Sequence, residues 1–150
     1  MTTTAAKQPR ILIAEDNLQG AELMEAYLSQ SPFEVRTASD GESTLRLVRE
    51  WRPDILLLDI MMPKLSGYEV CKRLRSDPAT RSTPVLMVTA LDQPSDVDRA
   101  VEVGANDYLT KPINKSELLL RVNAMLVACQ KPDELTATLA YIEAVETSPK

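Results

Sequence analysis

The sequence has no histidine among its 150 residues. This absence excludes metal sites ligated by histidine and nucleophilic catalysis by a Ser-His or Cys-His pair. There are only two cysteines, Cys71 and Cys129, which lie far apart in apolar helical patterns. We interpret them as core or helix-face thiols of a protein in the reducing cytoplasm, because they do not form the pattern of a disulfide framework.

Long apolar runs are also absent, so the sequence predicts no membrane-spanning helix. The first residues, MTTTAAKQPR, lack the apolar core of an export signal, which agrees with a cytoplasmic location. The formal net charge of −5 argues weakly against nucleic acid as a direct ligand, since phosphate backbones select basic surfaces. What is present is 44% hydrophobic and 26% charged residues, as in a soluble globular domain.

Short apolar stretches alternate with amphipathic ones along the chain. The expected strands are residues 10–16, 33–37, 54–59, 83–90 and 107–112, and the expected helices are 18–30, 40–51, 66–77, 94–104 and 114–129. This alternation requires parallel pairing with helices on both faces of the sheet. Only the second strand alternates apolar and polar residues, as an edge strand does. We therefore predict an α/β fold with a doubly wound parallel sheet in the flavodoxin-like order 2-1-3-4-5.

Four of the expected strands end in residues that can do chemistry. In the stretch DILLLDIMMP, Asp59 follows four apolar residues, and the other ends carry Glu15 with Asp16, Thr89 and Lys111. Taken singly, each of these residues has an ordinary structural explanation. Acids after a strand often cap the next helix, threonine is a common strand residue, and lysine is usually solvated. Ligands of open parallel sheets bind at the carboxyl ends of the strands, so the fold brings all of these residues to one rim.

Together these residues suit phosphoryl transfer. Three adjacent carboxylates repel one another, and a hard divalent cation such as Mg²⁺ relieves that repulsion through oxygen ligands. An aspartate beside Mg²⁺ can act as a nucleophile and form an aspartyl-phosphate. Lys111 and the Thr89 hydroxyl can then neutralise and bind the phosphoryl oxygens, while the small Ala90 leaves room for the incoming group.

The segments ILIAED, ILLLDIMMPKLSG, VLMVTA and GANDYLTKPI resemble the receiver domain of two-component response regulators over residues 10–129. The last two, with SDPATRSTP, resemble receivers linked to cyclic-di-GMP signalling proteins. The resemblance implies that Asp59 accepts a phosphoryl group and that Glu15 and Asp16 form the acidic Mg²⁺ site with the Met61 carbonyl. It also implies Thr89 and Lys111 as phosphate sensors.

The resemblance implies further roles around this site. Tyr108 matches the aromatic residue that turns inward when Thr89 moves toward the phosphate, although simple packing of this tyrosine is also compatible. Pro63 and Gly67 shape the loop after Asp59, and the Lys111–Pro112 peptide is usually cis. The phosphoryl donor is a sensor histidine kinase or phosphotransfer protein. The face made by the fourth helix, fifth strand and fifth helix then binds a second copy or a downstream effector.

The termini lie outside the resemblance. We expect residues 1–9 to be a disordered lead and residues 130–150 to be a tail or linker helix. In the tail, apolar residues three or four apart predict an amphipathic helix: Leu135, Leu139, Ile142 and Val145. The alternatives are a frayed end and a linker or dimerising helix. The sequence leaves open whether the chain is a stand-alone receiver or part of a longer regulator.

Two other functions are alternatives to the phosphorylation-controlled switch. A hydrolase on a similar sheet would need a second aspartate two residues after the nucleophile, where Met61 stands. An interaction module that has lost phosphorylation would lack the acidic pair, the nucleophile or the lysine, and all of them are present here. The resemblance also implies that Met61 and Leu91 flank the approach of water to the phosphoryl group. Because neither side chain hydrogen-bonds strongly to water, we expect slow self-dephosphorylation.

Overall fold

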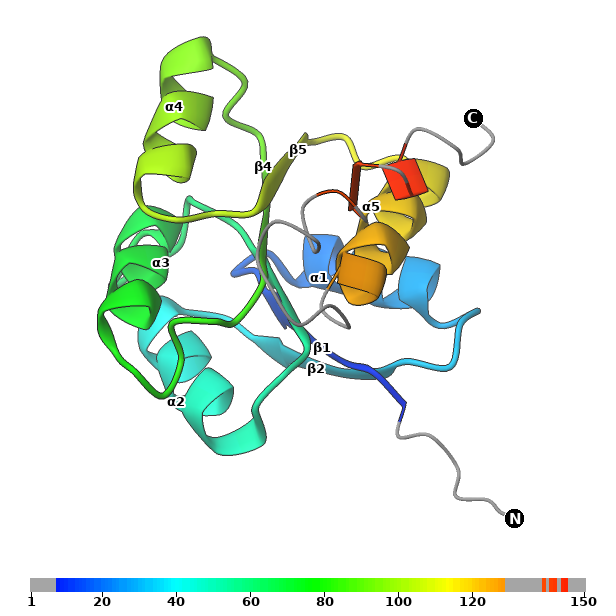
Figure 1. The fold of residues 1–150 in the computed structure, drawn as a ribbon, viewed down its shortest axis with the longest axis horizontal. Coiled ribbons are helices and arrows are strands. Elements are labelled where there is room, and N and C mark those ends of the chain that lie inside the picture. Colours follow the sequence, from blue (N-terminus) through cyan, green and yellow to red (C-terminus); the bar gives the residue numbers. More distant parts are fainter. Residues whose placement is uncertain (1–7, 129–138, 140, 143, 146–150) are drawn as a thin grey trace.

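The computed structural model describes residues 8–128, 139, 141–142 and 144–145. Its strands form a parallel five-stranded sheet in the order β2-β1-β3-β4-β5, which confirms the predicted order (Figure 1). The strands are β1 (Arg10–Ala14), β2 (Glu34–Ala38), β3 (Ile55–Leu58), β4 (Val85–Thr89) and β5 (Asp107–Thr110). Most are shorter than predicted, because the residues that follow them already belong to the loops at the rim of the sheet.

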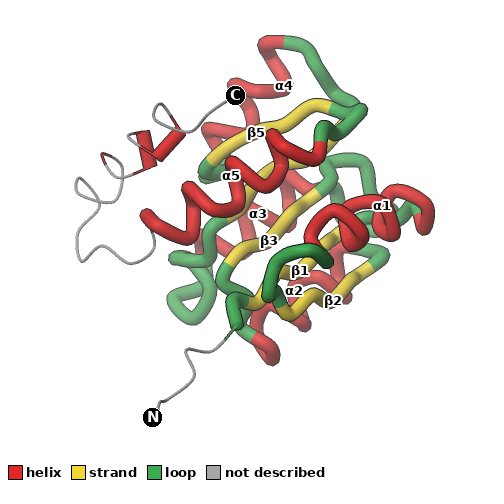
Figure 2. The backbone as a smooth tube through the Cα atoms, turned by 90° about the vertical axis from the view of Figure 1, so that its right-hand side faces the viewer, coloured by secondary structure: helices red, strands yellow, loops and turns green. Residues whose placement is uncertain are grey.

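The helices form a layer on each face of the sheet. They are α1 (Leu18–Leu28), α2 (Gly41–Trp51), α3 (Gly67–Ser76), α4 (Pro94–Glu102) and α5 (Lys115–Ala128). Helices α1 and α5 cover one face, and α2, α3 and α4 cover the other (Figures 1 and 2). Each of the first three helices begins at a side-chain cap, in which Asn17, Asp40 or Ser66 accepts a hydrogen bond from a backbone N–H of the first turn.

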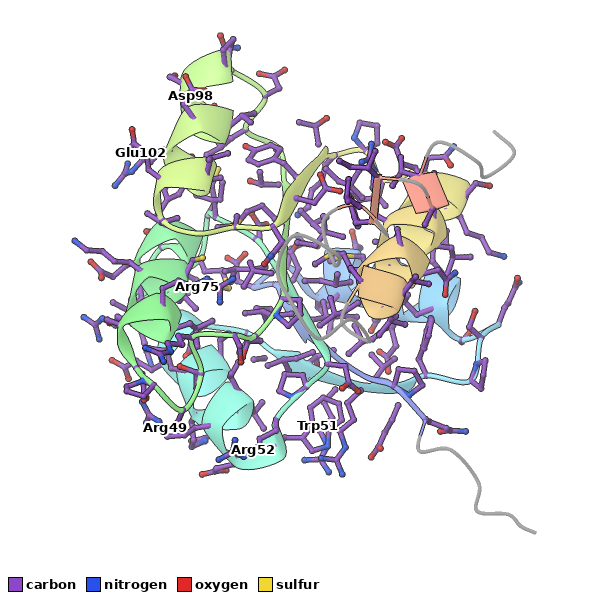
Figure 3. All side chains as sticks on the ribbon, viewed as in Figure 1. Arg49, Trp51, Arg52, Arg75, Asp98 and Glu102 are labelled. Atoms are coloured by element: carbon purple, nitrogen blue, oxygen red, sulfur yellow. The ribbon has the colours of Figure 1, made fainter. Side chains whose placement is uncertain are left out.

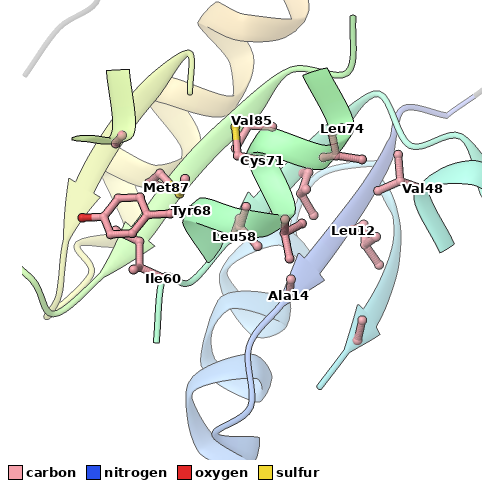
Figure 4. Close-up of a cluster of buried hydrophobic side chains, with 14 of the residues drawn as sticks. Leu12, Ala14, Val48, Leu58, Ile60, Tyr68, Cys71, Leu74, Val85 and Met87 are labelled. Carbon is pink, nitrogen blue, oxygen red and sulfur yellow. The ribbon is translucent and has the colours of Figure 1, made fainter. Parts of the chain in front are cut away.

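The sheet separates two apolar clusters. On one face, Leu12, Leu58 and Met87 pack with Val70, Cys71 and Leu74 of α3 (Figure 4). On the other face, the alternate strand residues pack against α1 and α5. All residues of β3 and β4 are buried, as expected for interior strands, whereas most of β2 is exposed. The buried strands therefore give a fixed base for the side chains at their carboxyl ends.

The cysteine prediction is confirmed for Cys71, which is a free thiol buried in the core. Its Sγ lies 3.3 Å from the Val103 carbonyl oxygen at the end of α4. Cys129 lies outside the described residues. In the part of the chain that the structure describes, no helix has both the length and the apolar character needed to cross a membrane.

Only part of the predicted tail helix lies within the described residues. Of residues 130–150, the described ones are helical. Leu139 and Ile142, which were predicted to form the apolar side of this helix, are 58% and 44% exposed. Instead, Tyr141 packs against the cluster beneath α1 and α5. Val145, the other described member of the predicted apolar set, is half-buried, as are Tyr141 and Ala144. The lead at residues 1–7 and Leu135 lie outside the described residues.

Candidate functional site

The backbone extends the sheet beyond the ends of its strands and so places the site residues along one rim. The Glu15 N–H donates to the Ala38 carbonyl at 3.0 Å, and the Asp59 N–H donates to the Ala14 carbonyl at 3.0 Å. On the other side, the Lys111 N–H donates to the Thr89 carbonyl at 2.8 Å. Because the strands are parallel, these extensions all lie at the carboxyl end of the sheet.

Three carboxylates meet at this rim. Oxygen atoms of Glu15, Asp16 and Asp59 all lie within 4.8 Å of one another. Glu15 and Asp59 are buried, with 3% and 5% of their surface exposed, whereas Asp16 is exposed. The predicted acidic cluster is therefore formed, with one open side. A donor set made only of carboxylate oxygens fits a hard cation of the Mg²⁺ type, which keeps several waters.

Lys111 connects the two buried carboxylates. Its Nζ donates to Asp59 Oδ2 at 2.9 Å and also to Glu15 Oε1. The sequence predicted that Lys111 would lie at the rim but not that it would bridge these two acids. Strand ends predict which residues meet, but they do not tell which oxygen a flexible lysine reaches.

The pKa values of Glu15, Asp59 and Lys111 are shifted by burial and by their mutual contacts. Burial, together with repulsion from Asp59, raises the pKa of Glu15 above its usual value. Burial also disfavours charge on Asp59, but hydrogen bonds from Lys111 and the Met61 N–H outweigh it and lower the pKa of Asp59. Burial opposes the charge on Lys111, yet its two carboxylate partners raise its pKa. Asp59 is therefore the better anion of the pair, as a nucleophile requires.

The loop after β3 fixes the backbone beside Asp59. The Met61 N–H donates to Asp59 Oδ1 at 3.1 Å, and the Gly67 N–H donates to the Ile60 carbonyl at 2.8 Å. A Cβ on Gly67 would lie 2.5 Å from the Asp59 carbonyl oxygen, so only glycine permits this close approach. Pro63 lies within the same loop, and its carbonyl accepts the Leu65 N–H at 2.9 Å.

Thr89 and Tyr108 lie beside one loop. Thr89 is fully buried at the end of β4, and its hydroxyl oxygen accepts the Leu91 N–H at 3.5 Å. The half-buried Tyr108 donates its hydroxyl to the Leu91 carbonyl at 2.7 Å, and burial raises the pKa of this tyrosine to about 12. Ala90 is exposed between them. The Lys111–Pro112 peptide is cis, as the resemblance implied.

The sequence profile of the response regulator receiver domain matches residues 11–123. The chain belongs to the response regulator receiver family. Among curated relatives, the response regulator PleD of Caulobacter vibrioides is 44% identical over 116 residues, which cover 77% of this chain and 26% of PleD. The DNA-binding dual master transcriptional regulator RpaA of Synechocystis is 38% identical over 141 residues, which cover 94% of this chain and 57% of RpaA.

The receiver thus spans between about a quarter and a little over half of these relatives' length. Solved structures are similar over the same region. The chemotaxis protein CheY4 of Vibrio cholerae matches with a TM-score of 0.75 and 28% identity, over 79% of this chain and 99% of CheY4. The BeF3-activated DrrB receiver domain matches with a TM-score of 0.72 and 32% identity, over 80% of this chain and 98% of DrrB.

Proposed function

We propose that this receiver takes a phosphoryl group onto Asp59 from a histidine kinase or a phosphotransfer protein. The observation that carries the proposal is the cluster of Glu15, Asp16 and Asp59 with Lys111 bound to two of its members. Asp59 is nearly buried yet ionised in preference to its neighbour, because Lys111 and the Met61 N–H stabilise its charge. These are the features that a carboxylate nucleophile needs.

The carboxylates of Glu15, Asp16 and Asp59, with the Met61 carbonyl, would hold Mg²⁺. The ion supplies charge neutralisation for the phosphoryl oxygens. An Asp59 oxygen attacks phosphorus while the bond from phosphorus to the donor nitrogen breaks. The electron pair of that bond stays on the nitrogen, and a donor phosphohistidine that is protonated on its other ring nitrogen therefore leaves as neutral histidine. Lys111 then exchanges its Asp59 contact for a phosphoryl oxygen. Loss of the one carboxylate charge and gain of the phosphate charges favour this exchange.

The output is a change of the face formed by α4, β5 and α5. We infer that Thr89 donates its hydroxyl to the phosphoryl group and that Tyr108 rearranges with it. Their shared neighbour Leu91 supports this coupling, because both side chains are hydrogen-bonded to its backbone. A second copy or an effector would bind the altered face. The change is a shift between two states and is limited by how differently the phosphoryl group binds each.

The proposal is tested by mass spectrometry after incubation with acetyl phosphate and Mg²⁺. The wild-type chain is expected to gain one phosphoryl group, and Asp59→Asn is expected to gain none while keeping its fold, since the amide preserves the shape. Asp98→Asn, a change of an exposed aspartate on α4, is the matched control and should still be labelled. Labelling of Asp59→Asn would overturn the assignment of the acceptor.

A further inference from the structure

Tyr141 connects the tail to the edge of the sheet. The described part of the tail lies beside α5 and β5 (Figure 1). The Tyr141 hydroxyl donates to Asp107 Oδ2, at the start of β5, and accepts from Arg121 Nη1 of α5 at 3.4 Å. Its neighbours Leu139 and Ile142 are largely exposed. Tyr141 therefore links this segment to both β5 and α5.

Asp107 receives contacts on both of its oxygens. Oδ1 accepts the N–H of Tyr108 at 2.8 Å, while Oδ2 accepts Arg121 Nη1 at 3.1 Å together with the Tyr141 hydroxyl. The Asp107 side chain is only 17% exposed, and this burial raises its pKa. A change at Tyr141 is thus two hydrogen bonds away from the backbone of Tyr108.

The docked arrangement leaves Arg121 incompletely satisfied. Its Nε is buried and has no hydrogen-bond partner among the described residues, and its Nη2 lies 3.6 Å from Glu117 Oε1, at the long end of an ion pair. An unpaired buried donor costs free energy that water or another acceptor can recover. The contact is therefore suited to exchange rather than to permanent closure.

We propose that the edge formed by β5 and α5 is a docking surface whose occupant is the described part of the chain's own tail, residues 139, 141–142 and 144–145. Tyr141 anchors the tail on the Asp107–Arg121 pair. Switching of this edge requires the tail to leave, and any partner that reaches this pair has to displace the tail first. Displacement rests on the proposed function, because the edge belongs to the proposed output face. The docking of the tail does not rest on it.

Docking is tested by NMR amide spectra of the full chain without Mg²⁺ or a phosphoryl donor. Tyr141→Ala is expected to shift the amides of Asp107, Tyr108 and Arg121 and to accelerate hydrogen exchange in residues 139–145 several-fold. Tyr141→Phe keeps the ring and should give the smaller change. Ile142→Ala, which alters an exposed side chain of the same segment, should affect only its neighbours. Docking is overturned if the amides of Asp107 and Arg121 do not move in Tyr141→Ala, or move equally in Ile142→Ala.

Displacement is tested by titrating the same proteins with beryllofluoride in the presence of Mg²⁺. If switching requires the tail to leave, then Tyr141→Ala should bind this phosphate mimic more tightly than the wild type, by at least about fivefold, since coupling between two sites is reciprocal. Equal affinities would overturn displacement. If neither protein bound beryllofluoride, the proposed function would fail instead, and the NMR result on docking would stand.

Discussion

Lys111 binds two buried carboxylates, so in the proposed reaction it is already positioned for the incoming phosphoryl group. Its contact with Glu15 can persist while its contact with Asp59 is exchanged. An amine that keeps one partner loses less conformational freedom on binding the second than a solvated lysine does. The bridge therefore holds a positive charge at the point where negative charge accumulates.

The side chains of Met61 and Leu91 bear on the lifetime of the proposed aspartyl-phosphate. Met61 is 60% exposed beside Asp59, and Leu91 is half-buried in the loop after β4. Neither is expected to orient the water that hydrolysis needs. Met61→Asn combined with Leu91→Glu should therefore accelerate phosphate loss, measured as the decay of the phosphorylated mass. An unaltered decay would indicate that loop mobility, and not water positioning, sets the lifetime.

At the scale of elements, the start of α2 responds to pH. Asp40 Oδ1 accepts the Ser43 N–H at 2.8 Å, and this hydrogen bond, with the nearby Lys64, lowers the pKa of Asp40 below its usual 3.8. The carboxylate thus adds stability that is fully present above the unfolded-state pKa. That stability is lost as the pH falls through the lowered, folded-state pKa.

We therefore expect Asp40→Ala to melt at a lower temperature than the wild type at pH 7, with a smaller difference at pH 3. Asp40→Asn caps the helix without ionising, so the difference in melting temperature between Asp40→Asn and Asp40→Ala should be the same at pH 3 and pH 7. The measurement is thermal unfolding followed by circular dichroism at both values of pH. A difference between Asp40→Ala and wild type that is the same at pH 3 and pH 7 would contradict a role for the ionised cap.

A second element-scale feature is the contact of α3 with the loops that precede β4 and β5. Arg75, labelled in Figure 3, donates to the carbonyls of Gly104, Arg81 and Thr83 and to the Asn106 side chain, at 2.7–3.0 Å. Gly104 has φ = 100°, and a Cβ there would lie 2.8 Å from Arg75 Cγ. One guanidinium thus fixes the end of α4 and the entry to β5.

Arg75→Met should lower the free energy of unfolding by about 3 kcal/mol, because the variant leaves several acceptors without a donor. Arg73→Met is the matched control on the same helix. Its ion pair with Glu69 at 3.6 Å is exposed, and its loss should cost less than about 0.5 kcal/mol. Urea unfolding measures both. Equal effects of the two substitutions would show that Arg75 does not hold these loops.

The sequence was most informative where residue chemistry follows topology. The apolar strands and the alternating second strand predicted the sheet order, and the acids, threonine and lysine at the strand ends predicted the cluster around Asp59. The contacts of Arg75 were not predictable, because its partners are mostly backbone carbonyls, which have no sequence signal. The same holds for Tyr141, whose burial depends on the position of Asp107 and Arg121 and not on the periodicity of the tail.

At the scale of the whole molecule, Mg²⁺ binding at the rim should stabilise the entire fold. A ligand bound only by the folded state at about 100 times its Kd adds about 2.7 kcal/mol. We expect Mg²⁺ to raise the melting temperature of the wild type and to have a smaller effect on Asp16→Asn, which removes the charge of one ligand. Asp98→Asn changes the net charge equally at an exposed position and should respond as the wild type does. An equal Mg²⁺ effect on Asp16→Asn would remove Asp16 from the site.

The two edges of the sheet also bear on how the protein behaves when concentrated. The outer strand β2 carries the exposed charges of Glu34 and Arg36. The other edge strand, β5, is short and begins at Asp107, whose carboxylate is bound by Arg121. Such edges discourage pairing with strands of another molecule. The segments most prone to aggregation, Ile55–Leu58 and Val85–Thr89, are uncharged and wholly interior. Aggregation should therefore follow unfolding, so that conditions that preserve the fold also preserve solubility on storage.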